Sequence, residues 1–106
     1  MKALTVCVTG AGGGGFGEQI LKALRRSTLP YRLLATDMNP NSAGFCLADE
    51  TGVLPPASAP GYLNALLELC EKYEVQALLP GSEAEIAALS AKRQPFEEKG
   101  IFLPLG

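Results

Sequence analysis

The sequence contains no histidine and no tryptophan, and its three cysteines stand far apart. Because histidine and a C-x-x-C pair are both missing, a structural zinc site and a histidine-based catalytic triad are excluded within these 106 residues. Cys7, Cys46 and Cys70 form an odd set, and two of them fall in apolar segments where a thiol behaves as a small hydrophobic group. We therefore expect reduced cysteines and a cytoplasmic protein.

Positive charge is also scarce, because nine Lys and Arg residues stand against eleven Asp and Glu residues. The formal net charge of −2 leaves no basic face, so we expect no nucleic acid and no acidic membrane as a partner. Long apolar runs are missing too. The apolar stretch near the N-terminus soon reaches glycines and is too short for a signal peptide, and no stretch is long enough to span a membrane.

What is present is an ordinary globular composition, with 47% hydrophobic and 19% charged residues. A chain of this size buries enough surface for one core, so we expect a single domain over residues 1–106. The chain stops just after a segment that reads as a strand, and we expect it to be a fragment of a longer protein.

A glycine-rich loop organises the N-terminal part of the chain. Alternating apolar residues predict a strand over Leu4–Val8, and the helical stripe Ile20, Leu21, Leu24 predicts a helix directly after Gly17. Six of the eight residues from Gly10 to Gly17 are glycine. Strand, glycine loop and helix together are typical of a βαβ nucleotide-type unit, in which backbone N–H groups reach an anionic ligand at a helix N-terminus. The sequence thus predicts an anion site that includes Gly12, Gly13, Gly14 and Gly15.

A second strand is predicted over Tyr31–Thr36, and Asp37 follows at its carboxyl end. Asp37 lies twenty residues beyond Gly17, where such folds place an acid that accepts a hydrogen bond from a ribose hydroxyl. The alternative is that Asp37 or Asn39 caps the turn into Pro40 and a short helical segment over 42–47. The sequence leaves both interpretations open.

The remaining elements alternate in the same way. We predict a turn over 49–52, a third strand at 53–54, a helix capped by Ser58, a fourth strand over 75–79, a helix over 84–91 capped by Ser82, a charged helical segment over 92–99 and a fifth strand over 101–103. The leucine stripe of the long middle helix is predicted to be core. This order predicts a Rossmann-like α/β domain, with a mostly parallel sheet of about five strands between two layers of helices.

The carboxyl ends of parallel strands meet at one edge of a sheet, which is where such folds bind ligands. At this edge we expect the glycine loop, Asp37 and the loop that contains Gly81, Ser82 and Glu83. Glu83 lies in the first turn of the predicted helix, where a negative charge is favourable.

Several segments resemble one protein family. The stretches VTGAGGGGFGEQILKAL, ATDMNPNSAGFCLADE and VLPPASAPGYLNALLELCEKYEVQALLPGSEAEIAAL are similar to the N-terminal pre-ATP-grasp domain of ATP-grasp ligases, of the carbamoyl-phosphate-synthase-like group. The resemblance covers nearly the whole chain. It implies a pre-ATP-grasp fold and a longer enzyme that uses ATP and Mg²⁺ to convert a carboxylate into an acyl phosphate, which an amine or another nucleophile then attacks.

The resemblance also implies where the chemistry lies. ATP and the metal are expected in later ATP-grasp subdomains of the parent chain, so no residue of this chain is predicted to be catalytic or to bind a metal or cofactor. Gly12 to Gly15 are expected to line the side of the acceptor substrate, a small carboxylate or amine, and Ser82 and Glu83 are expected to face the cleft. Glu83 then has two interpretations, as a ligand for an amine or for a metal-bound water, or as a residue that caps the helix. Asp37 matches an acid of the family whose role varies.

Two other classes remain open. An NAD(P)-dependent oxidoreductase of the short-chain type is opposed by Phe16, which stands where its T-G-x-x-G-x-x-G pattern needs glycine, and by the absence of any tyrosine with a lysine four residues later. A non-catalytic nucleotide- or anion-binding module needs only the loop. In each case we expect no complete active site in this chain.

Overall fold

The computed structural model describes residues 3–12 and 16–105, and in that part of the chain it contains one parallel sheet in the order β3-β2-β1-β4. The strands are β1 (Leu4–Val8), β2 (Tyr31–Asp37), β3 (Glu50–Val53) and β4 (Ala77–Leu79). The helices are α1 (Gly17–Arg26), the 3-10 helix η1 (Ala43–Leu47), α2 (Tyr62–Lys72), α3 (Glu83–Ala91) and α4 (Gln94–Glu98). The Rossmann-like α/β class is therefore confirmed.

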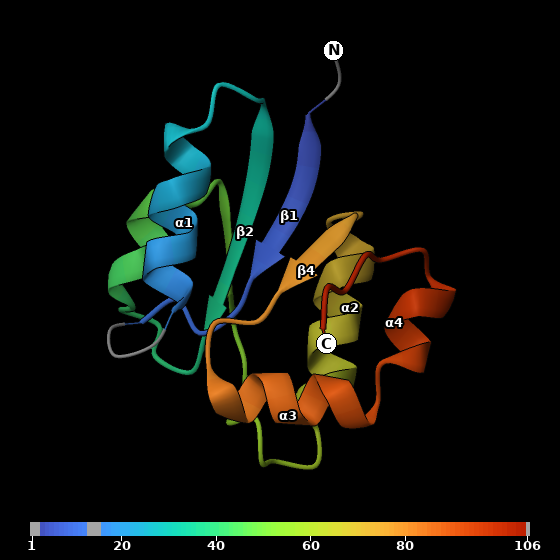
Figure 1. Ribbon diagram of the computed structural model, residues 1–106. Helices are drawn as coiled ribbons and strands as arrows, with labels where there is room; N and C mark the ends of the chain where they lie inside the picture. Colours follow the sequence, from blue (N-terminus) through green and yellow to red (C-terminus); the bar gives the residue numbers. More distant parts are fainter. Residues whose placement is uncertain (1–2, 13–15, 106) are drawn as a thin grey trace.

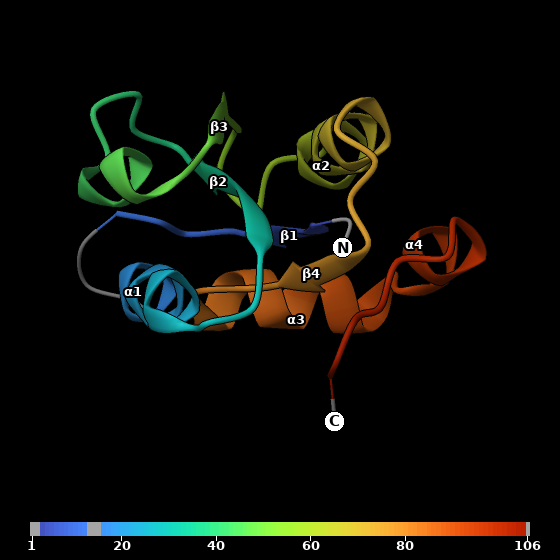
Figure 2. The same ribbon diagram turned by 90° about the horizontal axis from the view of Figure 1, so that it is seen from above.

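Helices cover both faces of the sheet. Figure 2 shows α1 on one side of the strands and α2 on the other. In Figure 1 the arrows of β1 and β2 point toward α3, which runs across the lower end of the sheet. The carboxyl ends of the strands and the N-terminus of α3 therefore meet at one edge.

The central strands are buried on both faces, as their apolar runs predict. Cys7 of β1 packs with Leu66 of α2 on one face, and Leu33 of β2 packs with Leu21 of α1 on the other. The predicted stripes of α1 and α2 are therefore core. Alternation along the strands divides the apolar residues between the two helix layers.

The predicted fifth strand over 101–103 is reduced to a single parallel bridge at Phe102, so the sheet has four strands where we expected about five. Phe102 O accepts a hydrogen bond from Leu78 N at 2.9 Å. The next two donors of this parallel ladder would be the nitrogens of Pro104 and Pro80. Proline carries no N–H, so the ladder ends after one residue.

The third strand also differs from the prediction. Residues 49–52 were expected to form a turn before a strand at 53–54, but β3 is Glu50–Val53. β3 is an edge strand whose side chains are alternately half-buried and exposed, so polar residues are tolerated in it. Gly52 fits because the Leu69 side chain lies over it, where a Cβ would come 2.5 Å from Leu69 Cδ1.

Helix boundaries follow the prediction at some ends and not at others. The expected cap Ser58 lies too early, because α2 begins at Tyr62 after Gly61, which makes no side-chain cap. The fourth strand begins at Ala77 instead of residue 75. Ser82 does cap α3, since its Oγ accepts a hydrogen bond from Glu85 N at 3.3 Å.

Two short predicted segments are helical. Residues 42–47 contain η1, and the charged segment 92–99 contains α4 with Pro95 in its first turn. The cysteines are free, with Cys7 and Cys70 buried and Cys46 exposed. No helix in the described ranges is long and apolar enough to cross a membrane.

Candidate functional site

A cleft of about 510 Å³ lies at the carboxyl edge of the sheet. Its walls come from the loops after β1, β2, β3 and β4 and from the first turns of α2 and α3: Gly10, Gly12, Asp37, Met38, Leu54, Pro55, Pro56, Ala57, Ser58, Tyr62, Ser82, Ala84 and Glu85. The predicted site residues Gly12, Asp37 and Ser82 therefore share one cleft. Gly13, Gly14 and Gly15 lie outside the described residues.

Gly81 supports the cleft and does not line it. Its N–H donates to Thr9 Oγ1 at 3.1 Å, and its carbonyl accepts from Phe16 N at 2.7 Å. A Cβ on Gly81 would come 2.6 Å from Gly17 Cα and closer still to the carbonyl oxygen of Thr9. The backbones of the loops after β1 and β4 are thus in direct contact with each other and with the start of α1. Only glycine fits at position 81.

Glu85 is the most buried carboxylate of the cleft, and sequence reasoning did not select it. It is 8% exposed, the Tyr62 hydroxyl donates to its Oε2, and Ser82 Oγ donates to its Oε1 at 2.9 Å. A Cβ on Gly10, whose φ is +63°, would come 2.6 Å from Oε1. Two hydroxyl groups and a glycine backbone therefore fix the position of this carboxylate.

The negative charge of Glu85 affects its neighbours. Burial raises the pKa of Tyr62 above its ordinary value, and the hydrogen bond to Glu85 raises it further, whereas Thr9 opposes the shift. The pKa of the Cys7 thiol is also raised, chiefly by its hydrogen bond with Cys70 and by burial, with a smaller contribution from the charge of Glu85. Both groups therefore stay protonated beside Glu85 near neutral pH.

The cleft holds negative charge without a cationic side chain. Glu85 and Asp37 belong to none of the ion pairs found among residues 3–12 and 16–105. None of the residues that line the cleft is lysine or arginine. A bound cation would therefore meet two carboxylates and no repelling positive charge.

Asp37 is the last residue of β2 and lies beside Gly12, whereas Glu85 follows β4, and β1 stands between these two strands in the sheet, so the two carboxylates belong to different ends of the cleft. A Cβ on Gly12 would come 2.6 Å from Asp37 Oδ2 and 3.4 Å from Ser42 Oγ. Asn39 N donates to the same Oδ2 at a long 3.4 Å, and Asn39 Oδ1 accepts from Asn41 N at 2.9 Å. Asp37 thus both faces the cleft and begins the turn, so the two interpretations of this residue are compatible.

Glu83 does not line the cleft and its side chain is exposed. Two residues correspond to about 200° around a helix, so Glu83 and Glu85 lie on opposite sides of the first turn of α3. The sequence did carry a signal for Glu85. Ser82 and Glu85 have the S-x-x-E spacing of a capping box, which turns the glutamate back toward the helix N-terminus.

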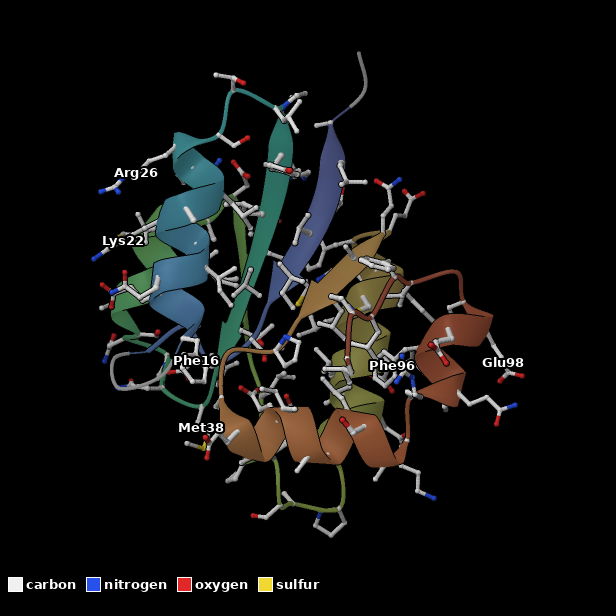
Figure 3. The ribbon with its side chains drawn as sticks, viewed as in Figure 1. Phe16, Lys22, Arg26, Met38, Phe96 and Glu98 are labelled. Atoms are coloured by element: carbon white, nitrogen blue, oxygen red, sulfur yellow. The ribbon has the colours of Figure 1, made fainter. Side chains whose placement is uncertain are left out.

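Apolar side chains lie exposed near the same edge. Phe16 is 54% and Met38 is 60% exposed, and Figure 3 shows Phe16 at the foot of α1 and Met38 beyond the end of β2. Within the described residues no group of three His, Cys, Asp or Glu side chains is placed to hold a metal ion.

Comparison with known proteins finds a family and solved structures that are similar to this chain. The model of one protein family, described as "PylC-like, N-terminal domain", matches residues 8–103. The solved structure of glycinamide-RNase-transformylase T from Mycobacterium tuberculosis is similar with a TM-score of 0.68 and 17% identity, over 93% of this chain and 28% of that chain. The ADP complex of N5-carboxyaminoimidazole ribonucleotide synthetase gives a TM-score of 0.68 and 20% identity, over 100% of this chain and 24% of that chain.

At these identities the two solved structures show the fold alone. The chain spans about a quarter of the length of each, 28% of one and 24% of the other. No curated protein matches the sequence.

Proposed function

Since the chain belongs to the family of PylC-like N-terminal domains, and is an N-terminal pre-ATP-grasp domain, we propose that its cleft holds the amine substrate of an ATP-dependent ligase. The ligase joins this amine to a carboxylate through an acyl phosphate. ATP transfers its terminal phosphoryl group to the carboxylate and leaves as ADP. The bound ammonium group gives up one proton to solvent, and the neutral amine then displaces phosphate from the acyl carbon and loses a second proton to give the amide. This chain provides the substrate side of that reaction as part of a longer protein.

The observation that carries the proposal is the environment of Glu85. Its carboxylate is buried in the cleft, held by Tyr62 and Ser82, and no lysine or arginine lines the space beside it. A carboxylate accepts hydrogen bonds only, and an ammonium group donates three. A charge-assisted hydrogen bond at this point would favour an ammonium group over a carboxylate ligand.

We propose that Mg²⁺ and ATP are held by other segments of the longer protein, as the resemblance to ATP-grasp ligases implies, and no step at Glu85 depends on them. Glu85 binds and orients the ammonium group. The apolar walls, which include Leu54, Pro55 and Ala57, receive the carbon chain.

A titration of the 15N-labelled chain at pH 7 tests this proposal, with n-butylamine and sodium butyrate as probes of opposite charge and equal chain length. We expect n-butylamine to shift the amide signals of Gly10, Ser82 and Glu85, and butyrate to leave them unchanged. Glu85→Gln should weaken amine binding about tenfold, the usual effect of losing a charged hydrogen-bond partner. Glu83→Gln is the matched control two residues away and should change binding less than twofold.

Binding of butyrate at these signals, or an equal loss in Glu85→Gln and Glu83→Gln, would contradict the proposal. The same experiment with NAD⁺ addresses the oxidoreductase alternative. Saturable shifts that run from the glycine loop to Asp37 with NAD⁺, and no response to the amine, would favour that alternative instead.

A further inference from the structure

Asp37 is the second carboxylate of the cleft, and the described residues use little of its capacity to accept hydrogen bonds. It is half-buried and lines the cleft. A carboxylate has about four positions that accept a hydrogen bond. Among the described residues the one donor to Asp37 is Asn39 N, at a long 3.4 Å. No ion pair of residues 3–12 and 16–105 includes Asp37. Its charge is therefore available to a ligand in the cleft.

The backbone limits how far Asp37 lies from the proposed ammonium position at Glu85. A Cβ on Gly10 would come 2.6 Å from Glu85 Oε1, and a Cβ on Gly12 would come 2.6 Å from Asp37 Oδ2. Successive Cα atoms are about 3.8 Å apart, so these two oxygens are at most about 16 Å apart. With about 2.9 Å for each hydrogen bond, the nitrogens of a ligand that bridges them are at most about 10 Å apart, the extended length of about seven carbons.

The rest of the cleft suits an uncharged chain between two positive groups. Leu54, Pro55, Pro56 and Ala57 line it, and no lysine or arginine does. A ligand carboxylate near Asp37 would meet negative charge without a cation to offset it. A second ammonium group there would instead form a charge-assisted hydrogen bond. The cleft therefore favours a ligand with an ammonium group at each end.

We infer that Asp37 determines the specificity of the cleft: it binds a second ammonium group, so that the amine substrate is a diamine, and it rejects a carboxylate at the same position. The inference rests on the proposed function, because Glu85 holds the amine that reacts. It adds no step to the reaction. The ammonium group at Asp37 keeps its charge and fixes the far end of the carbon chain.

Three ligands that differ only at the far end test this inference on the 15N-labelled chain at pH 7. n-Hexylamine, 1,5-diaminopentane and 6-aminohexanoate share one ammonium group and five methylene groups, and end in a methyl, an ammonium and a carboxylate group. Diamines from 1,3-diaminopropane to 1,7-diaminoheptane, each with its monoamine, locate the best chain length.

At the best length we expect the second ammonium group to tighten binding about tenfold and to shift the Asp37 and Asn39 amide signals. A diamine has two equivalent ends, which alone give about twofold, so only a larger gain counts. We expect 6-aminohexanoate to bind more weakly than n-hexylamine.

Asp37→Asn tests the residue itself, because it removes the charge and nearly keeps the shape. In this variant diamine and monoamine should bind within about twofold of each other, and 6-aminohexanoate should lose its disadvantage. Asp49→Asn is the matched control, because Asp49 is not among the residues that line the cleft, and it should keep the diamine gain. Glu85→Gln should weaken monoamine and diamine alike.

The outcomes separate this inference from the proposed function. If n-hexylamine binds at Glu85 but no diamine gains more than about twofold, or if Asp49→Asn removes the gain as Asp37→Asn does, the role of Asp37 is overturned and the amine site at Glu85 stands. Binding of 6-aminohexanoate as tight as that of n-hexylamine also overturns it. Diamine binding that Asp37→Asn removes and Glu85→Gln leaves unchanged contradicts the proposed function and supports the cation site at Asp37. If neither monoamines nor diamines bind, both are overturned.

Discussion

The two ends of the cleft place carboxylates in opposite conditions. At one end Glu85 is buried, and Tyr62 and Ser82 donate hydrogen bonds to its two oxygens. At the other end Asp37 is half-buried, its one described donor is 3.4 Å away, and the neighbouring Ser42 hydroxyl is unpaired. The Glu85 end is organised without a ligand, whereas the Asp37 end has hydrogen-bonding capacity left over.

Because of this difference, substitutions at the two ends of the cleft should affect the stability of the folded protein differently. Loss of a donor to Glu85 should destabilise the folded protein, because a buried charge then loses its partner. Loss of the Ser42 hydroxyl should not, because no described residue uses it. The loops at both ends meet where the backbones of Gly10, Gly17 and Gly81 are in contact. A substitution there should therefore disturb the structure of both ends.

The largest effect is expected for Gly81→Ala. The new Cβ would overlap the Thr9 carbonyl and approach Gly17 Cα at 2.6 Å, and neither backbone can move without shifting a central loop. We expect a loss of about 3 kcal/mol in the free energy of unfolding, measured by urea denaturation. Gly61→Ala is the control, because a Cβ there meets nothing within 4 Å, and it should cost less than about 1 kcal/mol. Equal losses in the two variants would show that the crossing is not tight.

A smaller effect is expected for Tyr62→Phe, which removes the donor to Glu85 Oε2. The free energy of unfolding should fall by about 1 to 3 kcal/mol at pH 7. Because the pKa of Tyr62 is raised above its ordinary 10.0 in the folded state, the stability that it contributes is complete below pH 10 and is lost as pH rises above it. The difference between wild type and Tyr62→Phe in urea unfolding should therefore be constant from pH 7 to 9.5 and shrink above pH 10.

Tyr73→Phe is the matched control for this prediction, because the described contacts of Tyr73 involve its ring, under Lys72 Nζ at 5.1 Å, and not its hydroxyl. Its stability should change by less than about 0.5 kcal/mol. If Tyr73→Phe and Tyr62→Phe unfold at the same urea concentration, the Glu85 end is not held by its hydrogen bonds.

The sequence could predict features that depend on neighbouring residues, but not those that depend on contacts between distant segments. α1, α3 and the Ser82 cap follow from signals within one turn of each helix, so they were predicted correctly. β3 was misplaced because its bounds are set by pairing with β2, from Leu34 opposite Glu50 to Asp37 opposite Val53, and no pattern within residues 49–54 contains that register. The partnership of Glu85 with Tyr62 joins residues 23 positions apart, and no local pattern contains it. Asp37 and Gly12 could be selected from the sequence because Asp37 stands at the end of a predicted strand and Gly12 stands in the glycine loop after another.

Replacement of Ser42 should change stability in the opposite direction. Ser42→Ala removes a buried hydroxyl that has no partner among the described residues, and Thr36→Val does the same with nearly unchanged shape. We expect the free energy of unfolding of each variant to exceed that of wild type by up to about 1 kcal/mol without ligand, measured by urea denaturation. A loss of stability in Ser42→Ala would mean that its hydroxyl is paired inside the protein, and the Asp37 end would then have no unpaired hydroxyl.

The smallest effect concerns Asp49, at the amino end of β3, which has the cation that Glu85 and Asp37 lack. Arg25 Nη2 lies 3.0 Å from Asp49 Oδ2, and Leu33 N donates to the same oxygen at 2.8 Å. Burial alone would raise the pKa of Asp49, but the Leu33 N–H and the Arg25 guanidinium outweigh it and hold the pKa below 3.8. The resulting stability is therefore present above pH 3.8 and is lost as pH falls below it.

Because the pair is partly exposed and water screens it, we expect Asp49→Asn to lower the free energy of unfolding by only about 0.5 kcal/mol at pH 6. Urea denaturation at pH 6 and pH 3 measures this, and the deficit of Asp49→Asn should narrow at pH 3, because protonation of Asp49 in the unfolded wild type then removes part of the stability that the carboxylate contributes. Salt at 0.5 M should reduce the deficit at pH 6 as well, because it screens the attraction to Arg25. A deficit that narrows at pH 3 but is unchanged in salt would assign it to the hydrogen bond with Leu33 N alone, and the contrast between a carboxylate paired with a cation and the unpaired carboxylates of the cleft would lose its energetic basis.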